Sequence, residues 1–589
     1  MADKSLNKDT TNLDDTTWAH KWGYADTKMF VHTEDMTVEM TGNRYNLCGY
    51  RMPYLIPFAR EILGSDIDFT DMRPLVENPP VSPANINEGF FNAIKAKMGA
   101  EQYSQDDTIR LIHSHGQTTV DEISKVLYDK IERAVDLVVY PESQDDCVAL
   151  IQIAREHNVC LIPYGGGTNV SSALMIPESE TRMVVAVDMR RMDKIEWIDR
   201  TNMRASVQAG ILGSNLERLL EKEGLTTGHE PDSVELSTLG GWISTNASGM
   251  KRNRYGNIEE IVEDITLVTP EGVVEECHPM PRVAMGTQVQ KALFGSEGNL
   301  GLITKAVLKV HKLPEAKKYD AIVFKDWKTG VAFMYDLKRT DVIPASIRLV
   351  DNTQFRFGQA LKPAPEGMGI VKDKVQNFVI KSVKGFDVHE IVAATIVYEG
   401  SAAEVAYQEK VVNATAKKHG GISGGASNGE RGYMLTYAIA YIRDLLSNYY
   451  VIGETYETTC PWSRIQEVCD AVTRTVEAEH KAFGFPGKAY ASPRLTQMYH
   501  TGVCIYFTHG FYHKGVENAE EKFAAMEKKI RQAIMDAGGS ISHHHGVGKL
   551  RKEFLPQTMT PTSEMIVREL KQAVDPENIF GVRNNVLAE

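Results

Sequence analysis

The 589-residue sequence lacks several features that would assign it to a common class of protein. It contains no apolar run of about 18 residues or more, so no membrane-spanning helix is predicted. Its seven cysteines never form a Cys-x-x-Cys pair, which argues against a disulfide framework and against a zinc ribbon. Acidic residues outnumber basic ones by 78 to 65, and the net charge of −13 argues against nucleic acid as a partner.

Targeting signals are also missing. The first 17 residues are polar and contain no apolar signal-peptide core. The last four residues, Val-Leu-Ala-Glu, do not form a peroxisomal address of the S-K-L type. The sequence itself therefore predicts no particular subcellular location.

Length and residue pattern predict at least two α+β domains, because the chain exceeds the size of one hydrophobic core. The first part has predicted helices at 85–98, 118–134, 143–157 and 213–223 and strands at 136–140, 160–164, 183–188, 194–199, 204–209, 264–269 and 302–311. The second part has predicted strands at 320–324, 346–350, 394–398 and 503–508 and helices at 403–418, 434–450, 462–482 and 515–537. We predict an N-terminal helical region at 1–130, a first domain at 131–315, a second at 316–570 and a C-terminal segment at 571–589 that packs on the first domain.

Three glycine-rich loops lie in the first predicted domain. Residues 164–169 read Tyr-Gly-Gly-Gly-Thr-Asn directly after a strand, and residues 295–301 read Gly-Ser-Glu-Gly-Asn-Leu-Gly directly before one. Between them, residues 228–249 are dense in Ser, Thr and Gly, so no amphipathic helix is predicted there. Each loop alone fits a tight turn, but three together favour a dinucleotide held by backbone N–H groups and hydroxyls. Neither the Walker nor the Rossmann spacing is present.

Several side chains of the second predicted domain are suited to acid/base or anion chemistry. His543, His544 and His545 are consecutive, and in a strand such residues point alternately to opposite faces. The spacing therefore leaves a zinc site, a solvated run and an acid/base or phosphate-binding cluster all open. Arg443 lies in an apolar helix and needs an anion, since the adjacent Asp444 is expected to point away from it. Tyr506 and Arg348 lie in predicted strands, where a core aromatic and a structural ion pair are the alternatives.

The three loops resemble the FAD-contacting loops of the vanillyl-alcohol-oxidase flavoprotein superfamily. Within it, residues 227–233, 344–352, 431–444 and the His triplet with its tail at 542–551 closely resemble the alkyldihydroxyacetonephosphate synthase family. The resemblance covers roughly residues 130–585. It implies an α+β fold, with a two-subdomain, PCMH-type FAD-binding domain and an α+β cap domain for the substrate.

The resemblance also implies non-covalent FAD and no metal. The implied cofactor-binding residues are Pro163, Tyr164, Gly165, Gly166, Gly167, Thr168, Asn169, Asp232, Ser233, Val234, Glu235, Leu236, Ser237, Thr238, Thr245, Asn246, Ala247, Ser248, Gly295, Ser296, Glu297, Gly298, Asn299, Leu300 and Gly301. The implied catalytic residues are Tyr506, His543, His544, His545, Arg348 and His229, and Arg443 is implied to bind the substrate.

The implied reaction belongs to ether-lipid biosynthesis. The acyl chain of 1-acyl-dihydroxyacetone phosphate is exchanged for a long-chain fatty alcohol, through an adduct at flavin N5 and without net redox change. Peripheral contact with a membrane, a homodimer and a peroxisomal location are further implications of the resemblance.

Three alternatives remain at this point. An FAD-dependent 2-hydroxyacid dehydrogenase, of the D-lactate or glycolate type, would have the same fold. A zinc hydrolase would use the His triplet as its metal site. A non-catalytic protein with a flavin-binding fold would have neither activity.

Overall fold

The computed structural model of the chain describes residues 16–77, 79–276, 280–364 and 386–587. They form two compact units. Unit 1 comprises Trp22–Pro74 and Pro314–Ser540 together with a short N-terminal piece that ends at Trp18. Unit 2 comprises Leu75–Leu313, the chain from Ile541 onward and residues 19–21. None of the described helices is long and apolar enough to cross a membrane.

Unit 2 contains a four-stranded sheet with the order β4 (Tyr103–Ser104), β5 (Leu137–Val139), β7 (Val184–Asp188), β6 (Cys160–Tyr164). The last three strands run parallel. Helix α5 (Gln144–Glu156) connects β5 with β6, and the hydroxyl of Ser143 caps it by accepting the N–H of Asp146. Its buried stripe, Cys147, Leu150, Ile151 and Ala154, has helical spacing and packs in the core of the sheet. The sequence predicted this βαβ unit correctly.

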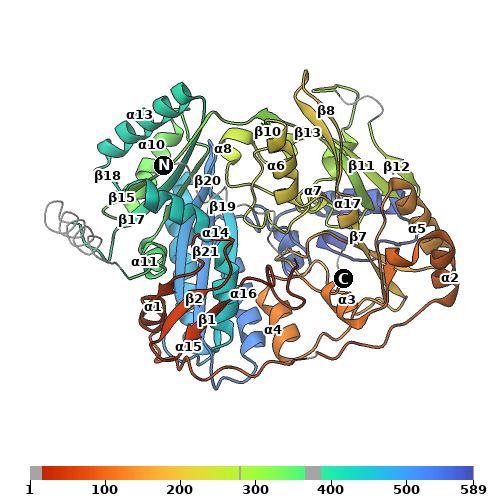
Figure 1. Cartoon of the computed structure of the whole chain (residues 1–589), viewed down its shortest axis with the longest axis horizontal. Helices are drawn as coiled ribbons and strands as arrows, with labels where there is room; N and C mark the ends of the chain where they lie inside the picture. Colours follow the sequence, from red (N-terminus) through yellow and green to blue (C-terminus); the bar gives the residue numbers. More distant parts are fainter. Residues whose placement is uncertain (1–15, 78, 277–279, 365–385, 588–589) are drawn as a thin grey trace. The chain divides into compact units, whose positions relative to one another are not determined.

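The second large sheet of unit 2 is antiparallel, with the order β12 (Gly272–Val274), β11 (Val262–Thr269), β13 (Leu302–Lys309), β9 (Arg204–Gln208), β8 (Ile195–Asp199). The short strands β10 (Leu225–Thr226) and β14 (His311–Lys312) pair with each other. The helices are α2 (Glu88–Lys97), α3 (Asp107–Ile112), α4 (Val120–Tyr128), α6 (Gly213–Lys222), α7 (Leu239–Thr245), α8 (Arg252–Tyr255), α9 (Ile258–Ile261) and α17 (Pro561–Val574). They are labelled, where there is room, in Figure 1.

Helix α7 lies within residues 228–249, where the sequence analysis predicted no amphipathic helix. The helix has only seven residues. The hydroxyl of Thr238 accepts the N–H of Gly241 at its start, and Asn246 ends it with a left-handed backbone, φ +53°. Small polar residues do not exclude so short a helix when both of its ends are capped.

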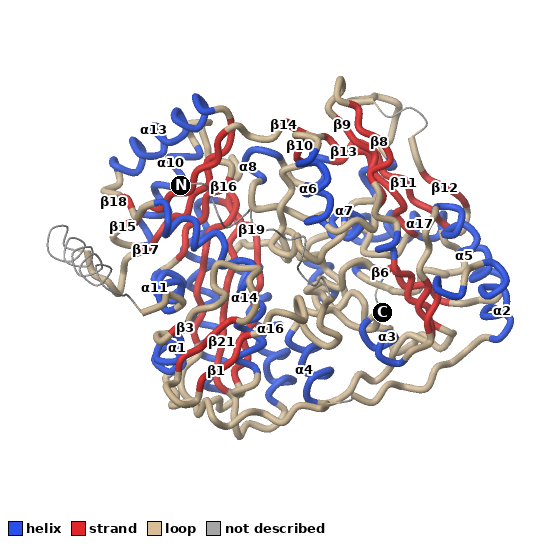
Figure 2. Tube along the Cα trace, in the orientation of Figure 1, coloured by secondary structure: helices blue, strands red, loops and turns tan. Residues whose placement is uncertain are grey.

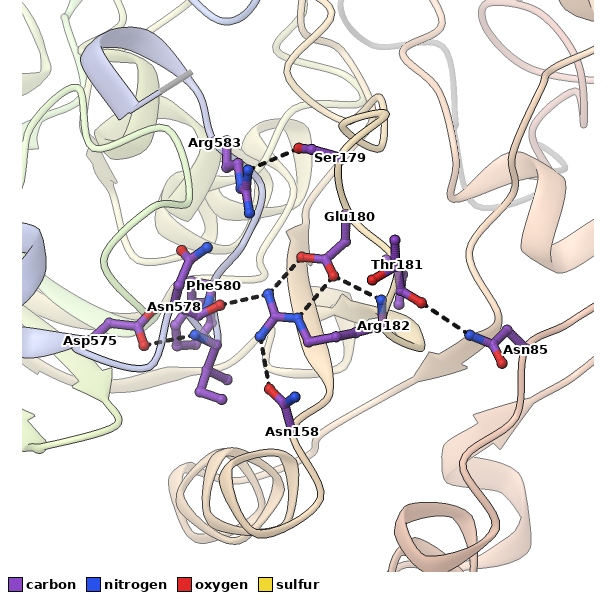
Figure 3. A network of polar contacts seen from close by, with 12 residues as sticks. Asn85, Asn158, Ser179, Glu180, Thr181, Arg182, Asp575, Asn578, Phe580 and Arg583 are labelled. Carbon is purple, nitrogen blue, oxygen red and sulfur yellow. Dashed lines mark hydrogen bonds and ion pairs between the residues drawn. The ribbon is translucent and has the colours of Figure 1, made fainter. Parts of the chain in front are cut away.

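The C-terminal segment completes the core of unit 2. Ile579 and Phe580 are fully buried in the same core cluster as α5, and the carbonyl of Ile579 accepts the N–H of Leu161 in β6. Figure 3 shows Arg182 at the centre of the polar contacts that hold this segment. Its guanidinium binds the buried Glu180 at 2.6 Å and the carbonyl of Asn578 at 2.8 Å.

Unit 1 is built on a seven-stranded sheet, whose strands are red in Figure 2. Their order is β18 (Ile422–Ser423), β15 (Ala316–Phe324), β17 (Val392–Gly400), β16 (Ser346–Val350), β20 (Tyr490–Met498), β21 (Gly502–Tyr512), β19 (Val451–Pro461). The helices are α1 (Leu55–Leu63), α10 (Trp327–Lys338), α11 (Asn352–Ala360), α13 (Ala402–Lys418), α14 (Ala426–Ser447), α15 (Ile465–Ala482) and α16 (Ala519–Asp536). A smaller sheet contains β1 (Met29–His32), β2 (Thr37–Met40) and β3 (Arg51–Met52).

Two central features of unit 1 were not predicted. Strands β19 and β20 carry polar residues such as Glu457 and Arg494 at positions where a buried strand is usually apolar, and β20 also contains Pro493. Helix α14 begins at Ala426, eight residues before the predicted start at 434. Residues of β20 and α14, among them Arg494 and Arg431, interrupt the hydrophobic pattern and line a cavity in this unit.

The compact units differ from the predicted domain boundaries. The His triplet, which the sequence analysis assigned to the second domain, packs within unit 2. The physical reason is that the turn after it is bound by its backbone N–H groups to Glu297 of unit 2. Likewise, Trp22–Pro74 belongs to unit 1, whereas residues 1–130 were predicted as one region on the core.

Candidate active site

The first glycine loop follows β6 and lies directly against the second loop. A Cβ on Gly166 would lie 1.7 Å from the carbonyl oxygen of Leu236, so only glycine fits there. Gly167 has a φ of +66°, which also favours glycine. Two of the predicted cofactor loops therefore contact each other through their backbones.

Backbone donors of this loop suit an anionic ligand. The N–H groups of Gly166, Gly167, Thr168 and Asn169 have no hydrogen-bond acceptor among the residues that the structure describes. Consecutive N–H groups without protein acceptors form a concave binding site for phosphate oxygens. The donor set fits the pyrophosphate of a dinucleotide.

Buried polar side chains next to the loop lead to the same conclusion. Within the described part of the chain, Asn169 Nδ2, Ser171 Oγ, Ser172 Oγ and His115 Nε2 are buried and have no hydrogen-bond partner. Buried polar atoms are nearly always hydrogen-bonded in folded proteins. Four such atoms around one loop are expected where a polar ligand completes the site.

The sequence analysis missed the segment from His113 to Thr119, which lies against the first loop. The N–H of Gln117 donates to the carbonyl of Gly167 at 2.8 Å, and the hydroxyl of Thr118 donates to the carbonyl of Asn169 at 2.5 Å. His113 Nε2 lies 2.8 Å from the buried carboxylate of Asp188. The available signal was a polar run, His-Ser-His-Gly-Gln-Thr-Thr, between two predicted helices.

The hydroxyls of the second loop are largely used within the protein. Ser237 Oγ donates to the carbonyl of Ser233 and accepts the indole N–H of Trp242, while Ser248 Oγ donates to Asn257. These predicted cofactor residues thus shape the loop through their side chains, and the structure does not assign those hydroxyls to a ligand.

His229, at the start of the second loop, is almost fully buried against Trp242, with 4.7 Å between the ring centres. Neither ring nitrogen has a hydrogen-bond partner among the described residues. Burial, with a smaller contribution from the nearby His544, lowers the pKa of His229 to about 3 against the opposing effect of Glu230. The imidazole is therefore neutral at physiological pH and can act as a hydrogen-bond donor or acceptor rather than as a cation.

The His triplet does not lie in a strand, so the predicted alternation of its side chains is wrong. The rings follow each other closely, with centres 5.0 Å apart for His543 and His544 and 4.7 Å apart for His544 and His545. His543 Nδ1 and His544 Nδ1 lie 2.8 Å apart, so one of the two nitrogens carries the shared proton. A turn brings together rings that a strand would have separated.

In unit 1, Arg348 and Tyr506 lie on the same face of the seven-stranded sheet. Val350, two residues after Arg348 in β16, pairs with Arg494 of β20, and Arg494 pairs with Tyr506 of β21. Tyr506 also pairs with Glu457 of β19. Directly paired residues of antiparallel strands share a face. The guanidinium of Arg494, a residue that the sequence analysis missed, lies 4.4 Å from the centre of the Tyr506 ring.

A cavity of about 940 Å³ covers this face of the sheet. Arg348 and Arg494 of the sheet and Arg431 of α14 line it, and Thr508, two residues after Tyr506, does so as well. The buried Arg348 donates to the hydroxyl of Thr436, 2.6 Å away on α14. The remaining wall is rich in apolar side chains, including Tyr50, Phe58, Phe355, Phe357, Leu435 and Ile439.

Arg443 is placed differently from the prediction. Its guanidinium bends back to bind the carboxylate of the adjacent Asp444, with Nη2 2.7 Å and Nε 3.0 Å from the same oxygen. The long side chain thus overcomes the angle between neighbours on a helix, which the sequence analysis treated as too large. Arg443 is not among the residues that line the cavity of unit 1.

Fold and site together define a flavoprotein of the FAD-linked oxidase class. A family model described as an FAD binding domain matches residues 135–278, and one described as the C-terminal domain of FAD linked oxidases matches residues 313–583. A solved p-cresol methylhydroxylase structure has the same fold, with a TM-score of 0.63 at 14% identity over 85% of this chain and 98% of that one. This confirms the predicted PCMH-type fold, and FAD is the cofactor.

Closer relatives define the family. The alkyldihydroxyacetonephosphate synthase of Caenorhabditis elegans is 41% identical over 96% of this chain and 94% of its own length. A solved alkyldihydroxyacetonephosphate synthase structure has a TM-score of 0.82 at 29% identity, over 95% of this chain and 96% of that one. The chain belongs to the alkyldihydroxyacetonephosphate synthase family.

Proposed function

We propose that the chain catalyses a step of ether-lipid biosynthesis, in which the acyl chain of 1-acyl-dihydroxyacetone phosphate is exchanged for a long-chain fatty alcohol. The products are 1-alkyl-dihydroxyacetone phosphate and a fatty acid. The observation that carries the proposal is the cavity of unit 1, where four arginines, Arg348, Arg356, Arg431 and Arg494, stand in a wall rich in apolar side chains. Guanidinium groups suit a phosphate, and each buried CH₂ of a lipid chain contributes about 0.8 kcal/mol.

The loops at 163–169, 232–238, 245–248 and 295–301, with His115, Ser171 and Ser172, would hold FAD, and its ring supplies a reversible acceptor of electrons. The protein's own residues handle protons and charge. A base among Tyr506, His543, His544 and His545 removes a proton from C1 of the substrate, and the fatty carboxylate leaves. The alcohol oxygen then bonds to C1 and gives up its proton, and the same base returns a proton to C1. His229 contributes a neutral imidazole, and Arg348 stabilises negative charge in the cavity.

Arg443 remains a proposed substrate ligand, although it is bound to Asp444. Substituting it by lysine removes the planar fork that recognises phosphate. We expect a higher KM for the acyl substrate with FAD still bound, measured by steady-state kinetics and the flavin absorption. An unchanged KM would exclude Arg443 from the substrate site.

The exchange reaction can be tested directly with FAD-loaded protein, 1-palmitoyl-dihydroxyacetone phosphate and hexadecanol. We expect the hexadecyl ether and palmitate in equal amounts, with the flavin oxidised before and after turnover. Bleaching of the flavin by D-lactate or glycolate, without ether product, would favour the dehydrogenase. Stoichiometric zinc together with palmitate release that does not depend on alcohol would favour the hydrolase.

The lipid substrates also support peripheral contact with a membrane. Met280, Met285 and Val289 are at least half exposed and lie close together in the sequence of unit 2, which makes them candidates for this contact. Co-sedimentation with phosphatidylcholine vesicles is expected for the wild type and reduced when the three residues are changed to serine. A homodimer and a peroxisomal location are proposed on family resemblance, to be tested by analytical ultracentrifugation and by microscopy of the tagged protein.

A further inference from the structure

The carboxylate of Glu297, in the third glycine loop, is bound to the turn that follows the His triplet. Oε1 accepts the N–H of Val547 at 2.6 Å, and both oxygens accept the N–H of Gly548, at 3.1 and 3.0 Å. The side-chain amide of Asn585 donates to Oε2 at 3.3 Å. The carboxylate thus binds backbone groups only two to five residues from the imidazoles of the triplet.

The backbone of Glu297 is held just as firmly to its other neighbours. Its N–H donates to the carbonyl of Ser244 in α7 at 2.9 Å, and its carbonyl accepts the side-chain amide of Asn584 at 2.8 Å. The residue has a left-handed backbone, φ +49°, although it is not glycine. That conformation is uncommon for a side chain of this size and persists only where the surroundings fix it.

The glycines of the turn allow this close approach. A Cβ on Gly546 would lie 2.5 Å from Glu297 Oε1, and one on Gly548 would lie 2.1 Å from the carbonyl oxygen of Ser171. Both glycines have positive φ values, +79° and +51°. The turn is therefore pressed between the third loop and the end of the first loop, and neither contact would survive a larger residue.

A buried arginine adds a second link from the first loop to the turn. Arg551 donates to the carbonyl of Gly546 at 2.9 Å and to the carbonyl of Val170 at 3.0 Å. It is the largest side chain in the described structure that is almost completely buried. Glu297 of the third loop binds the turn directly, and Arg551, which follows the turn in the chain, connects it to Val170 at the end of the first loop.

We propose that Glu297 is a positioning residue, whose carboxylate sets the place of the His543, His544 and His545 turn relative to the flavin loops. The sequence resemblance had placed Glu297 among the cofactor-binding residues, but its carboxylate faces backbone N–H groups of the protein. Cofactor binding by the loops and proton transfer by the imidazoles then both depend on the carboxylate of Glu297. The link between loop and turn stands on the contacts above, while its use in catalysis rests on the proposed function.

The test compares Glu297→Gln with Glu180→Gln. Glutamine keeps the size of the side chain but replaces one acceptor by an N–H₂ group, which faces the donors of Val547 and Gly548. Glu180 is a matched control, because it is also buried in unit 2 and paired with Arg182, at a place that does not contact the turn. Both variants are expected to lower the melting temperature.

Three measurements separate positioning from general stability. In Glu297→Gln, hydrogen exchange of the peptide covering 541–551 should accelerate about tenfold or more, and the affinity of apoprotein for FAD should fall about tenfold, whereas Glu180→Gln changes neither. The pH profile of the enzymatic reaction, in which the acyl chain is replaced by the alcohol, should shift only in Glu297→Gln. Equal effects of the two variants on all three measurements would overturn the proposal. So would a Glu297→Gln variant with unchanged hydrogen exchange and unchanged FAD affinity.

Hydrogen exchange and FAD titration need no catalytic activity. If the wild type fails to make the ether product, the proposed function fails, yet these two measurements still decide whether Glu297 holds the turn. If the wild type is active and Glu297→Gln keeps the wild-type hydrogen-exchange rate, FAD affinity and pH profile, the positioning role is wrong while the proposed function stands.

Discussion

At the residue scale, the cofactor site depends on atoms that leave no room for substitution. Gly166 is the clearest example, because the backbone of the second loop occupies the place where its Cβ would be. His115 shows a second kind of constraint, since an imidazole is buried there with one nitrogen left without a partner among the described residues. Each constraint yields a measurable consequence.

Gly166→Ala should abolish tight FAD binding. The new methyl group would force the first and second loops apart, and overpacking of this kind costs about 1–3 kcal/mol, or roughly one to two orders of magnitude in affinity. Fluorescence titration of the apoprotein with FAD measures the effect. Gly358→Ala in α11 is the control, because nothing lies within 4 Å of its Cβ position. Retention of wild-type FAD affinity in Gly166→Ala would contradict the loop geometry.

Because His115 is buried as a neutral imidazole, the apoprotein should be less stable at acid pH than at neutral pH. Burial lowers its pKa from 6.5 to about 4. Between these values the unfolded chain binds a proton that the folded protein does not, so stability falls as the pH drops through this window. The loss is about 1–3 kcal/mol. Urea unfolding of wild type and His115→Gln at pH 4.5 and 7 should show a smaller pH dependence in the variant. An equal pH dependence would mean that His115 is protonated in the folded state.

At the scale of elements, the parallel βαβ unit and long helices such as α13, α15 and α16 were predictable because their hydrophobic spacing is intact. Strands β19 and β20 were not, because polar residues such as Glu457 and Arg494 interrupt the apolar pattern that a buried strand usually has. The pairing of Tyr506 with Arg494 and Glu457 is a property of strand register, which no local pattern contains. For the same reason, no local pattern pointed to Arg494 as a site residue.

Arg494→Met should slow turnover by about tenfold or more while leaving FAD bound. A guanidinium over the ring of Tyr506 stabilises negative charge on the phenol, and a thioether does not. Steady-state kinetics at several pH values measure the change. The control is Arg339→Met, since Arg339 lies 4.5 Å from the ring of Tyr335 in a similar geometry on the exposed surface. A similar rate loss in both variants would indicate that the effect is not specific to the site.

At the scale of the whole molecule, neither unit is continuous in the sequence. Unit 1 takes an early segment and a long later one, and unit 2 is completed by residues from Ile541 onward. The core of unit 2 thus depends on Ile579 and Phe580, about 400 residues after β6. A tail that looks peripheral in the sequence is part of a core.

Phe580→Ala should therefore destabilise the protein by about 3–5 kcal/mol, as for other fully buried aromatic residues. The measurement is thermal unfolding, detected by the release of FAD, because the C-terminal segment lies in the unit with the cofactor loops. The control is Ile566→Ala on α17, where the side chain is 62% exposed and a change within about 0.5 kcal/mol is expected. Equal stability of the two variants would show that the C-terminal segment is dispensable.

The sequence by itself determined the α+β class, the glycine loops and the family, because these rest on short stretches whose meaning is local: a strand that ends in three glycines, or a His triplet with its Gly-Val-Gly-Lys tail. Only the tertiary structure decided which residues meet. It placed the turn after the His triplet on Glu297, Arg494 on Tyr506 and the 113–119 segment on the first loop. Such contacts join residues tens to hundreds of positions apart, and chain packing rather than local propensity selects them.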